Sequence, residues 1–171
     1  MVPLVLGLFI PFSLSTLARG ESKGAVQHAS PVAEVNQVPI TSAAVDEALR
    51  AYLRQIGHRE LSSSRMMTLK KEILGNLIEE ELLYQEGVRK GWRVGEEEIE
   101  AEAARLRDRF PSQEAFEAAL VKEKLTPEQI EAGLRRFILV RKVWNSASSM
   151  TDEEKKIWLK EMREHSEIKI Y

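Results

Sequence analysis

The fold is decided by residues 75–103, which read GNLIEEELLYQEGVRKGWRVGEEEIEAEA. Apolar residues recur at helical spacing on both sides of Gly91. Gly91 is suited to ending a helix, and Gly95 to preceding the next one. The stretch therefore predicts a long helix over about residues 65–90 and a second helix from residue 96 onward. The apolar stripe of the long helix is wide, which indicates more than one packing partner.

Two runs of glutamate within this stretch are candidates for chemistry, residues 79–81 and 96–98. Consecutive residues on a helix point in directions about 100° apart, so three in a row cannot converge on one metal ion or one substrate atom. We therefore predict that residues 79–81 face solvent, although Glu81 lies closest to the apolar row. Residues 96–98 are predicted to stabilise the positive end of the following helix.

The flanking sequence adds helices and two strands. Residues 126–129 (TPEQ) and 151–154 (TDEE) are capping boxes that predict two further helices, and Thr41 precedes another that runs to about Ile56. A short helix carries Phe116 after the break at residues 111–112. Residues 32–41 (VAEVNQVPIT) read as a short strand or hairpin, and residues 167–171 (EIKIY) as a strand that pairs with it. The predicted fold is mainly α, with about six helices in an irregular bundle and a short N-terminal strand paired with a C-terminal strand.

The N-terminus is typical of an export signal. Residues 2–14 form an apolar run of the length of a signal-peptide core, and Thr16 and Ala18 place small residues before a cleavage site. We predict a signal peptide over residues 1–18, a linker over 19–31, one domain over 32–171, and a periplasmic location. The alternative is an uncleaved membrane anchor. The absence of cysteine is compatible with an exported protein.

Composition and motifs exclude several function classes. The net charge of −2, from 25 basic and 27 acidic residues, does not indicate a nucleic-acid partner. The sequence contains no P-loop, no G-x-S-x-G and no G-x-G-x-x-G motif. None of the three histidines lies three or four residues from either glutamate run. We therefore predict no catalytic residue, no cofactor and no metal site.

Four segments together resemble one family. They are VAEVNQVPITSAAVDEAL (32–49), LKKEILGNLIEEELLYQEGVRKGWRVGEEEIEAE (69–102), SQEAFEAALVKEKLTPEQIEAGLRRFILVRKVW (112–144) and WLKEMREHSEIKIY (158–171). In this order they are similar to the core module of SurA-type periplasmic chaperones. The resemblance implies ATP-independent binding of unfolded outer-membrane or exported polypeptides. The parvulin isomerase domains of that family would fall between residues 144 and 151, where only a short loop remains, so the resemblance does not imply an enzyme.

A client-binding role requires apolar side chains that stay accessible. Large groups near the ends of the predicted elements are the candidates, and methionine suits a promiscuous surface because it can repack. Each of them could equally be ordinary core. Two other functions stay open, a parvulin-related prolyl isomerase and a partner protein dedicated to one envelope or secretion system. We expect a monomer or a domain-swapped dimer. The candidate client-binding residues are Tyr52, Met66, Met67, Trp92, Phe110 and Phe116.

Overall fold

The computed structural model describes residues 30–57, 61–123 and 125–171. The predicted signal peptide and most of the predicted linker lie outside these residues. The described chain is mainly α, with six helices and a small three-stranded sheet, as the sequence predicted. The elements are β1 (Pro31–Val35), β2 (Val38–Thr41), α1 (Ser42–Gln55), α2 (Ser63–Arg89), α3 (Glu96–Arg107), α4 (Gln113–Lys122), α5 (Pro127–Ser146), α6 (Asp152–Glu164) and β3 (Ile168–Ile170).

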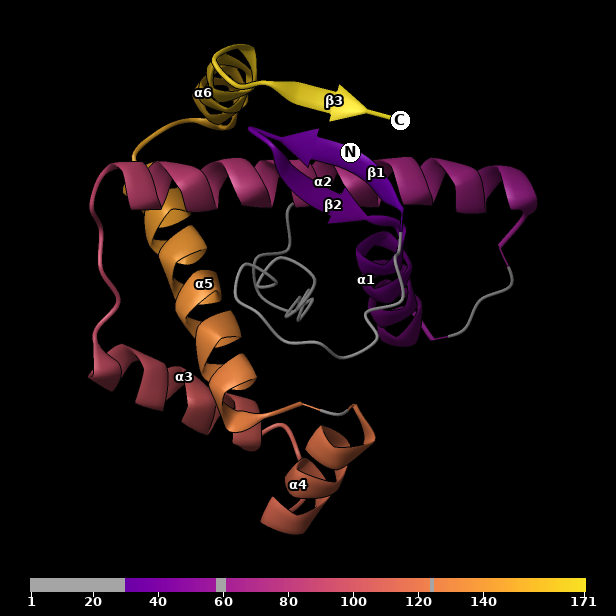
Figure 1. Cartoon of the computed structure of the whole chain (residues 1–171), viewed down its shortest axis with the longest axis vertical. Coiled ribbons are helices and arrows are strands. Elements are labelled where there is room, and N and C mark those ends of the chain that lie inside the picture. The colour runs from indigo at the N-terminus through magenta and orange to yellow at the C-terminus, as the bar shows by residue number, and fades with distance from the viewer. Residues whose placement is uncertain (1–29, 58–60, 124) are drawn as a thin grey trace.

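The long helix α2 organises the molecule (Figure 1). Helix α1 packs beneath its N-terminal half, and α5 crosses beneath its C-terminal half. The strand β3 and helix α6 lie on the opposite side of α2, while α3 and α4 gather at the far end of α5. This arrangement explains the wide apolar stripe, because α2 has partners on more than one face.

Side chains and glycines at the helix ends set the helix boundaries. The Thr41 hydroxyl accepts the Ala44 amide hydrogen at 3.2 Å, and the Thr126 and Thr151 capping boxes both form. Helix α2 starts at Ser63, two residues before the predicted start, because Ser62 accepts from the Arg65 amide at 3.3 Å. Gly91 follows α2 with a φ of +69°, a left-handed conformation that glycine adopts freely.

The N-terminal strands form a hairpin, of which β1 is the central strand of the sheet. Asn36 and Gln37 have φ values of 50° and 69°, which suits the two-residue turn between β1 and β2. The strand order is β2-β1-β3, so Pro39 lies in an edge strand, where its missing N–H costs no ladder hydrogen bond. The predicted pairing of the first and last strands is confirmed, since Val35 lies opposite Ile168 and Ala33 opposite Ile170 in antiparallel register.

The core consists of three clusters. The first lies between the hairpin, α1 and the N-terminal half of α2 and includes the fully buried Ala33 and Val35. The second lies between α3 and α5. The third joins Leu83 of α2 to Val140 and Val143 of α5, with half-buried residues of α6 packed against it. The chain therefore buries its apolar surface around both halves of α2.

Candidate functional site

The six candidate client-binding residues fall into separate places. Two of them, Tyr52 in α1 and Met66 in α2, pack half-buried against the first core cluster. Their neighbour Met67 is 63% exposed. This end of the molecule therefore offers one free methionine above two partly covered groups, and we name residues 52, 66 and 67 the α1–α2 patch.

The two phenylalanines meet at the corner between α3 and α4. Their ring centroids are 5.3 Å apart with an interplanar angle of 65°, an edge-to-face contact. Phe116 is buried, while Phe110 is half-buried. Five residues beyond Phe116, Val121 of α4 is 78% exposed. The sequence analysis did not single out Val121, and the available signal was an apolar residue among the polar positions of a short helix.

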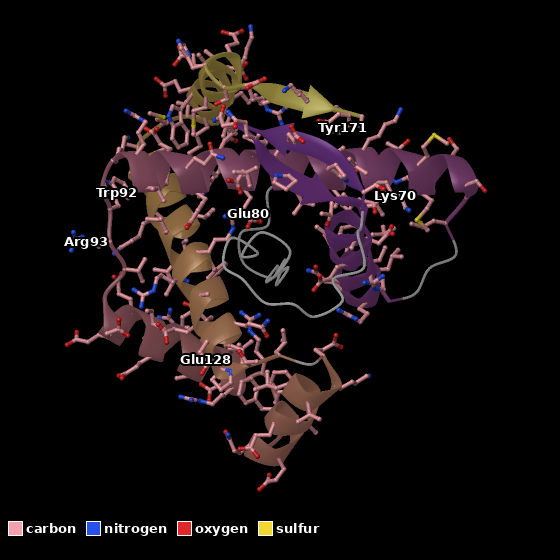
Figure 2. The ribbon with its side chains drawn as sticks, viewed as in Figure 1. Lys70, Glu80, Trp92, Arg93, Glu128 and Tyr171 are labelled. Carbon is pink, nitrogen blue, oxygen red and sulfur yellow. The ribbon has the colours of Figure 1, made fainter. Side chains whose placement is uncertain are left out.

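The sixth candidate, Trp92, stands apart from both groups. It lies in the link between α2 and α3, labelled in Figure 2, and packs half-buried against the second and third core clusters. The Lys90 ammonium lies 5.7 Å from its ring centroid. The six candidates are therefore distributed over the α1–α2 patch, the α3–α4 corner and this link.

A second exposed apolar group was missed by the sequence analysis. Ile157 of α6 is 52% exposed, and Ile170 and Tyr171 at the end of β3 are 65% and 68% exposed. The alternation of residues 167–171 was read as a strand that closes the sheet. Alternation places Ile170 on the same face as Ile168 and Tyr171 on the other face, so the pattern gave no signal that both would be exposed.

The prediction that residues 79–81 face solvent is wrong. Glu81 is buried, its side chain only 4% exposed, and it accepts from the Arg136 guanidinium at 2.6 Å. Glu80 pairs with the same Arg136 at 3.5 Å, and Glu79 pairs with Arg163 of α6 at 3.0 Å. The three carboxylates do diverge, as helical geometry requires, but α2 is covered on several sides by helices that carry arginine.

Glu81 is the centre of a polar network that spans the molecule. Its carboxylate accepts from the Gln85 amide at 2.7 Å, and the same amide group donates to the Val35 carbonyl at 3.1 Å. The Gln85 carbonyl oxygen accepts from Asn36 at 2.7 Å. Arg136 of α5 is thus linked through α2 to the turn between β1 and β2. The buried charge is satisfied on both oxygens, which removes most of the cost of burying it.

Burial and charge also shift the pKa of two half-buried glutamates, one in α2 and one in α1. Burial raises the pKa of Glu80, and the Arg136 charge opposes that rise. Burial also raises the pKa of Glu47 in α1, opposed by Arg50, and the negative charge of Glu123 after α4 adds to the rise. Glu80 is labelled in Figure 2, below α2 and between α1 and α5.

The second buried carboxylate, Glu102 of α3, was also missed. It accepts from Arg141 at 2.8 Å and from Arg105 at 2.9 Å. The Arg141 guanidinium thereby joins α5 to α3. The predicted role of residues 96–98 at the start of α3 is supported by contacts: Glu98 accepts from the Gly95 amide at 3.0 Å and Lys142 at 2.6 Å, and Glu96 pairs with Arg135.

The chain matches the family model of the SurA-like N-terminal domain over residues 1–144. It belongs to that family. The SurA-like N-terminal domain is a non-catalytic, chaperone-type domain, and the SurA family is periplasmic. No curated protein matches the chain. Within residues 30–57, 61–123 and 125–171, no helix has both the length and the apolar character needed to cross a bilayer.

The SurA-like match ends just before the last part of the fold. Helix α5 continues to Ser146, and α6 begins at Asp152 after a connection of residues 147–151. No isomerase domain can lie within so short a connection. Helix α6 and β3 therefore follow directly on the matched region, and they return to the hairpin at its start.

Proposed function

We propose that this protein is an ATP-independent periplasmic chaperone that holds unfolded outer-membrane or other exported polypeptides. The observation that carries the proposal is the SurA-like match over residues 1–144. Further support comes from exposed apolar side chains at several places on the surface. Such groups can bind the apolar segments of unfolded chains, and the fold is stabilised without them.

The client-contacting surface that we favour is the α1–α2 patch. Methionine has three rotatable bonds and a polarisable sulfur, so Met67 can adapt to different client side chains. Met66 and Tyr52 form the partly covered base beneath it. We propose the α3–α4 corner, with Phe110, Phe116 and the exposed Val121, as a second contact, and Trp92 as a more distant one.

The first test of this function is suppression of aggregation. A urea-unfolded outer-membrane barrel protein is diluted into buffer with and without the purified protein, without ATP, and light scattering is followed. A holdase suppresses scattering at near-stoichiometric ratios. No suppression over a range of ratios would overturn the proposal in favour of a partner protein dedicated to one envelope or secretion system.

The second test asks whether the α1–α2 patch is the contact. Met67→Ser removes an apolar group that is 63% exposed, so we expect unchanged stability and weaker suppression. The matched control is Met150→Ser, which removes a methionine that is 37% exposed in the connection after α5. Equal suppression by both variants would place the contact elsewhere. Met66→Ser with Met67→Ser would unfold the domain only if Met66 is needed for the core.

A further inference from the structure

The two edges of the small sheet differ in their ability to accept a strand. The Tyr171 amide donates to the Val32 carbonyl at 3.0 Å, and the Asn36 amide donates to the Glu167 carbonyl at 2.8 Å. Residues 32, 34 and 36 of the hairpin therefore direct their backbone groups toward β3. Pro39 lies opposite Glu34 on the other side, so its backbone faces away from β1 at the outer edge of β2. That outer position lacks an N–H, which weakens any pairing there.

The segment that occupies the favourable edge is lightly held. We call residues 152–170, which form α6 and β3, the C-terminal strap. Helix α6 has no buried residue, and of β3 only Ile168 is half-buried. Opposite it, Ala33 and Val35 of β1 are 0% exposed. Helix α6 stays packed on the third core cluster through the half-buried Trp158, Leu159 and Met162. Release of β3 alone exposes little apolar surface of its own, and local opening is easiest where few apolar contacts are lost.

Beside the apolar packing of α6, the C-terminal strap is held by polar contacts that are partly exposed. Arg163 pairs with Glu79 at 3.0 Å, where their side chains are 35% and 23% exposed, and it donates to the Gly75 carbonyl at 3.2 Å. The Asn36 side chain accepts from the Glu167 amide at 2.8 Å. Water can replace each of these bonds, so they direct the strap to its place without fixing it there.

We propose that the β1 edge is an exchangeable strand site, which takes an extended segment of an unfolded polypeptide in place of residues 168–170. This proposal rests on the proposed function and names one site for it. The SurA-like match ends at residue 144, so it contains β1 but not the segment that covers its edge. In the free protein, the chain's own β3 pairs with this edge. A strand of a bound client takes its place by adding to the sheet, a binding mode called β-augmentation.

The present occupant shows the chemistry that the site takes. Ile168 lies opposite Val35 on the core side, and Lys169 lies opposite Glu34 on the other face. The Tyr171 hydroxyl bonds the Glu34 carboxylate, which is the main cause of the raised pKa of Tyr171. The client segment is therefore extended, with aliphatic residues alternating with polar ones and a basic or tyrosine side chain beside Glu34. Alternation of this kind is typical of the segments that form β-strands when a β-protein folds.

The test uses a labelled synthetic peptide with the sequence of residues 166–171, SEIKIY, and fluorescence anisotropy. The wild-type chain should bind it weakly, because the strap competes. Lys169→Pro removes the N–H that β3 offers to Glu34, so the site becomes free and binding should tighten by about tenfold or more. A peptide with proline at the position of Lys169 should bind neither protein. Equal affinity of the wild-type chain and Lys169→Pro for SEIKIY would overturn the proposal.

A reversible lock provides a second measurement in one folded protein. Ala33→Cys with Ile170→Cys joins two directly opposed residues across β1 and β3, at a separation that suits a disulfide. Oxidation should weaken peptide binding by about tenfold or more, and reduction should restore it. The wild-type chain has no cysteine and should not respond to reductant. Equal binding in both redox states would overturn the proposal.

Two further readouts separate the remaining outcomes. If the wild-type chain forms a dimer and the oxidised lock variant does not, the strap is exchanged between two copies of the chain. The occupant of the β1 edge is then a second copy and not a client. The aggregation assay is scored independently with the oxidised lock. Full suppression together with absent peptide binding would overturn only the strand site, whereas absence of suppression by the wild-type chain would overturn the proposed function itself.

Discussion

Helix α2 has two neighbours that hold it in different ways. Its crossing with α5 is tight, because a Cβ atom at Gly87 would lie 2.8 Å from Leu139 Cγ, and Val143 is 0% exposed. Its contact with the C-terminal strap fully buries no residue of α6 and combines the half-buried Trp158, Leu159 and Met162 with the Arg163–Glu79 pair. Both contacts include an arginine and a glutamate of the same run in α2. The difference lies in how much apolar surface surrounds the charges.

This difference separates a permanent joint from an exchangeable one. At the α5 crossing, the buried Glu81–Arg136 pair is enclosed by side chains that must come apart together. At the strap, the Glu79–Arg163 pair is half-exposed, and the apolar side chains of α6 are only half-buried. Close packing makes opening cooperative, whereas a polar contact in water opens at small cost.

The largest expected contrast comes from apolar truncation on each side of α2. Leu83→Ala removes a side chain that is 1% exposed at the α5 crossing, and it should lower the free energy of unfolding by about 2–5 kcal/mol. Ile157→Ala changes a residue of α6 that is 52% exposed, and its effect should stay within about 0.5 kcal/mol. Urea unfolding followed by circular dichroism measures both. Similar losses would show that the strap is as firmly packed as α5.

The two arginine–glutamate pairs provide the next contrast. Glu81→Gln should lower the free energy of unfolding by about 2 kcal/mol, less than for a fully isolated pair because Arg136 retains Glu80. Glu79→Gln should lower it by less than about 1 kcal/mol, and high salt should reduce that difference further. Unfolding at low and high ionic strength distinguishes the two. A larger loss for Glu79→Gln would contradict the comparison.

Two glycines of α2 should respond with opposite signs. Gly87→Ala places a Cβ within 3 Å of Leu139, and repacking should cost about 1–3 kcal/mol against a smaller gain in helix propensity. Gly75→Ala meets no atom within 4 Å and keeps the carbonyl that accepts from Arg163, so it should stabilise by about 0.5–1 kcal/mol. Thermal unfolding of both variants is the measurement. Stabilisation by both would mean that α5 is not in tight contact at Gly87.

The smallest expected effect is a pH dependence at Glu80. Its pKa is raised in the folded state from a usual value of 4.5, so its ionisation disfavours folding. Its contribution is therefore fully present below that usual value and is lost as the pH rises through the raised pKa. Glu80→Gln should flatten this fall in melting temperature, and exposed Glu100→Gln should not. Identical pH profiles for the wild-type chain and Glu80→Gln would contradict the assignment.

The local features of the fold could be predicted from the sequence because they depend on neighbouring residues. Capping by Thr41, Thr126 and Thr151, the glycine after α2 and the turn at Asn36 are each settled within a few residues. The pairing of the first and last strands was also predictable, because only two segments carried a strand pattern. The start of α2 was misplaced by two residues because several adjacent serines can all serve as caps.

The environment of each candidate residue could not be predicted in the same way. Whether Met66 or Met67 is covered depends on a rotation of α2 against α1, and whether Phe116 is buried depends on how α4 meets Phe110. These choices need the position of a second element. A periodic pattern indicates a buried face, but it does not indicate which residue at its margin remains exposed.

The sequence by itself determined the number and approximate bounds of the helices, the hairpin and the family resemblance, because these follow from short-range backbone preferences and from the order of segments. Only the tertiary structure decided the roles of Glu79, Glu80 and Glu81. Their partners Arg136 and Arg163 come from α5 and α6, between 55 and 84 residues away along the chain. The packing of these distant helices determines which carboxylate is buried, and burial determines how much an ion pair contributes.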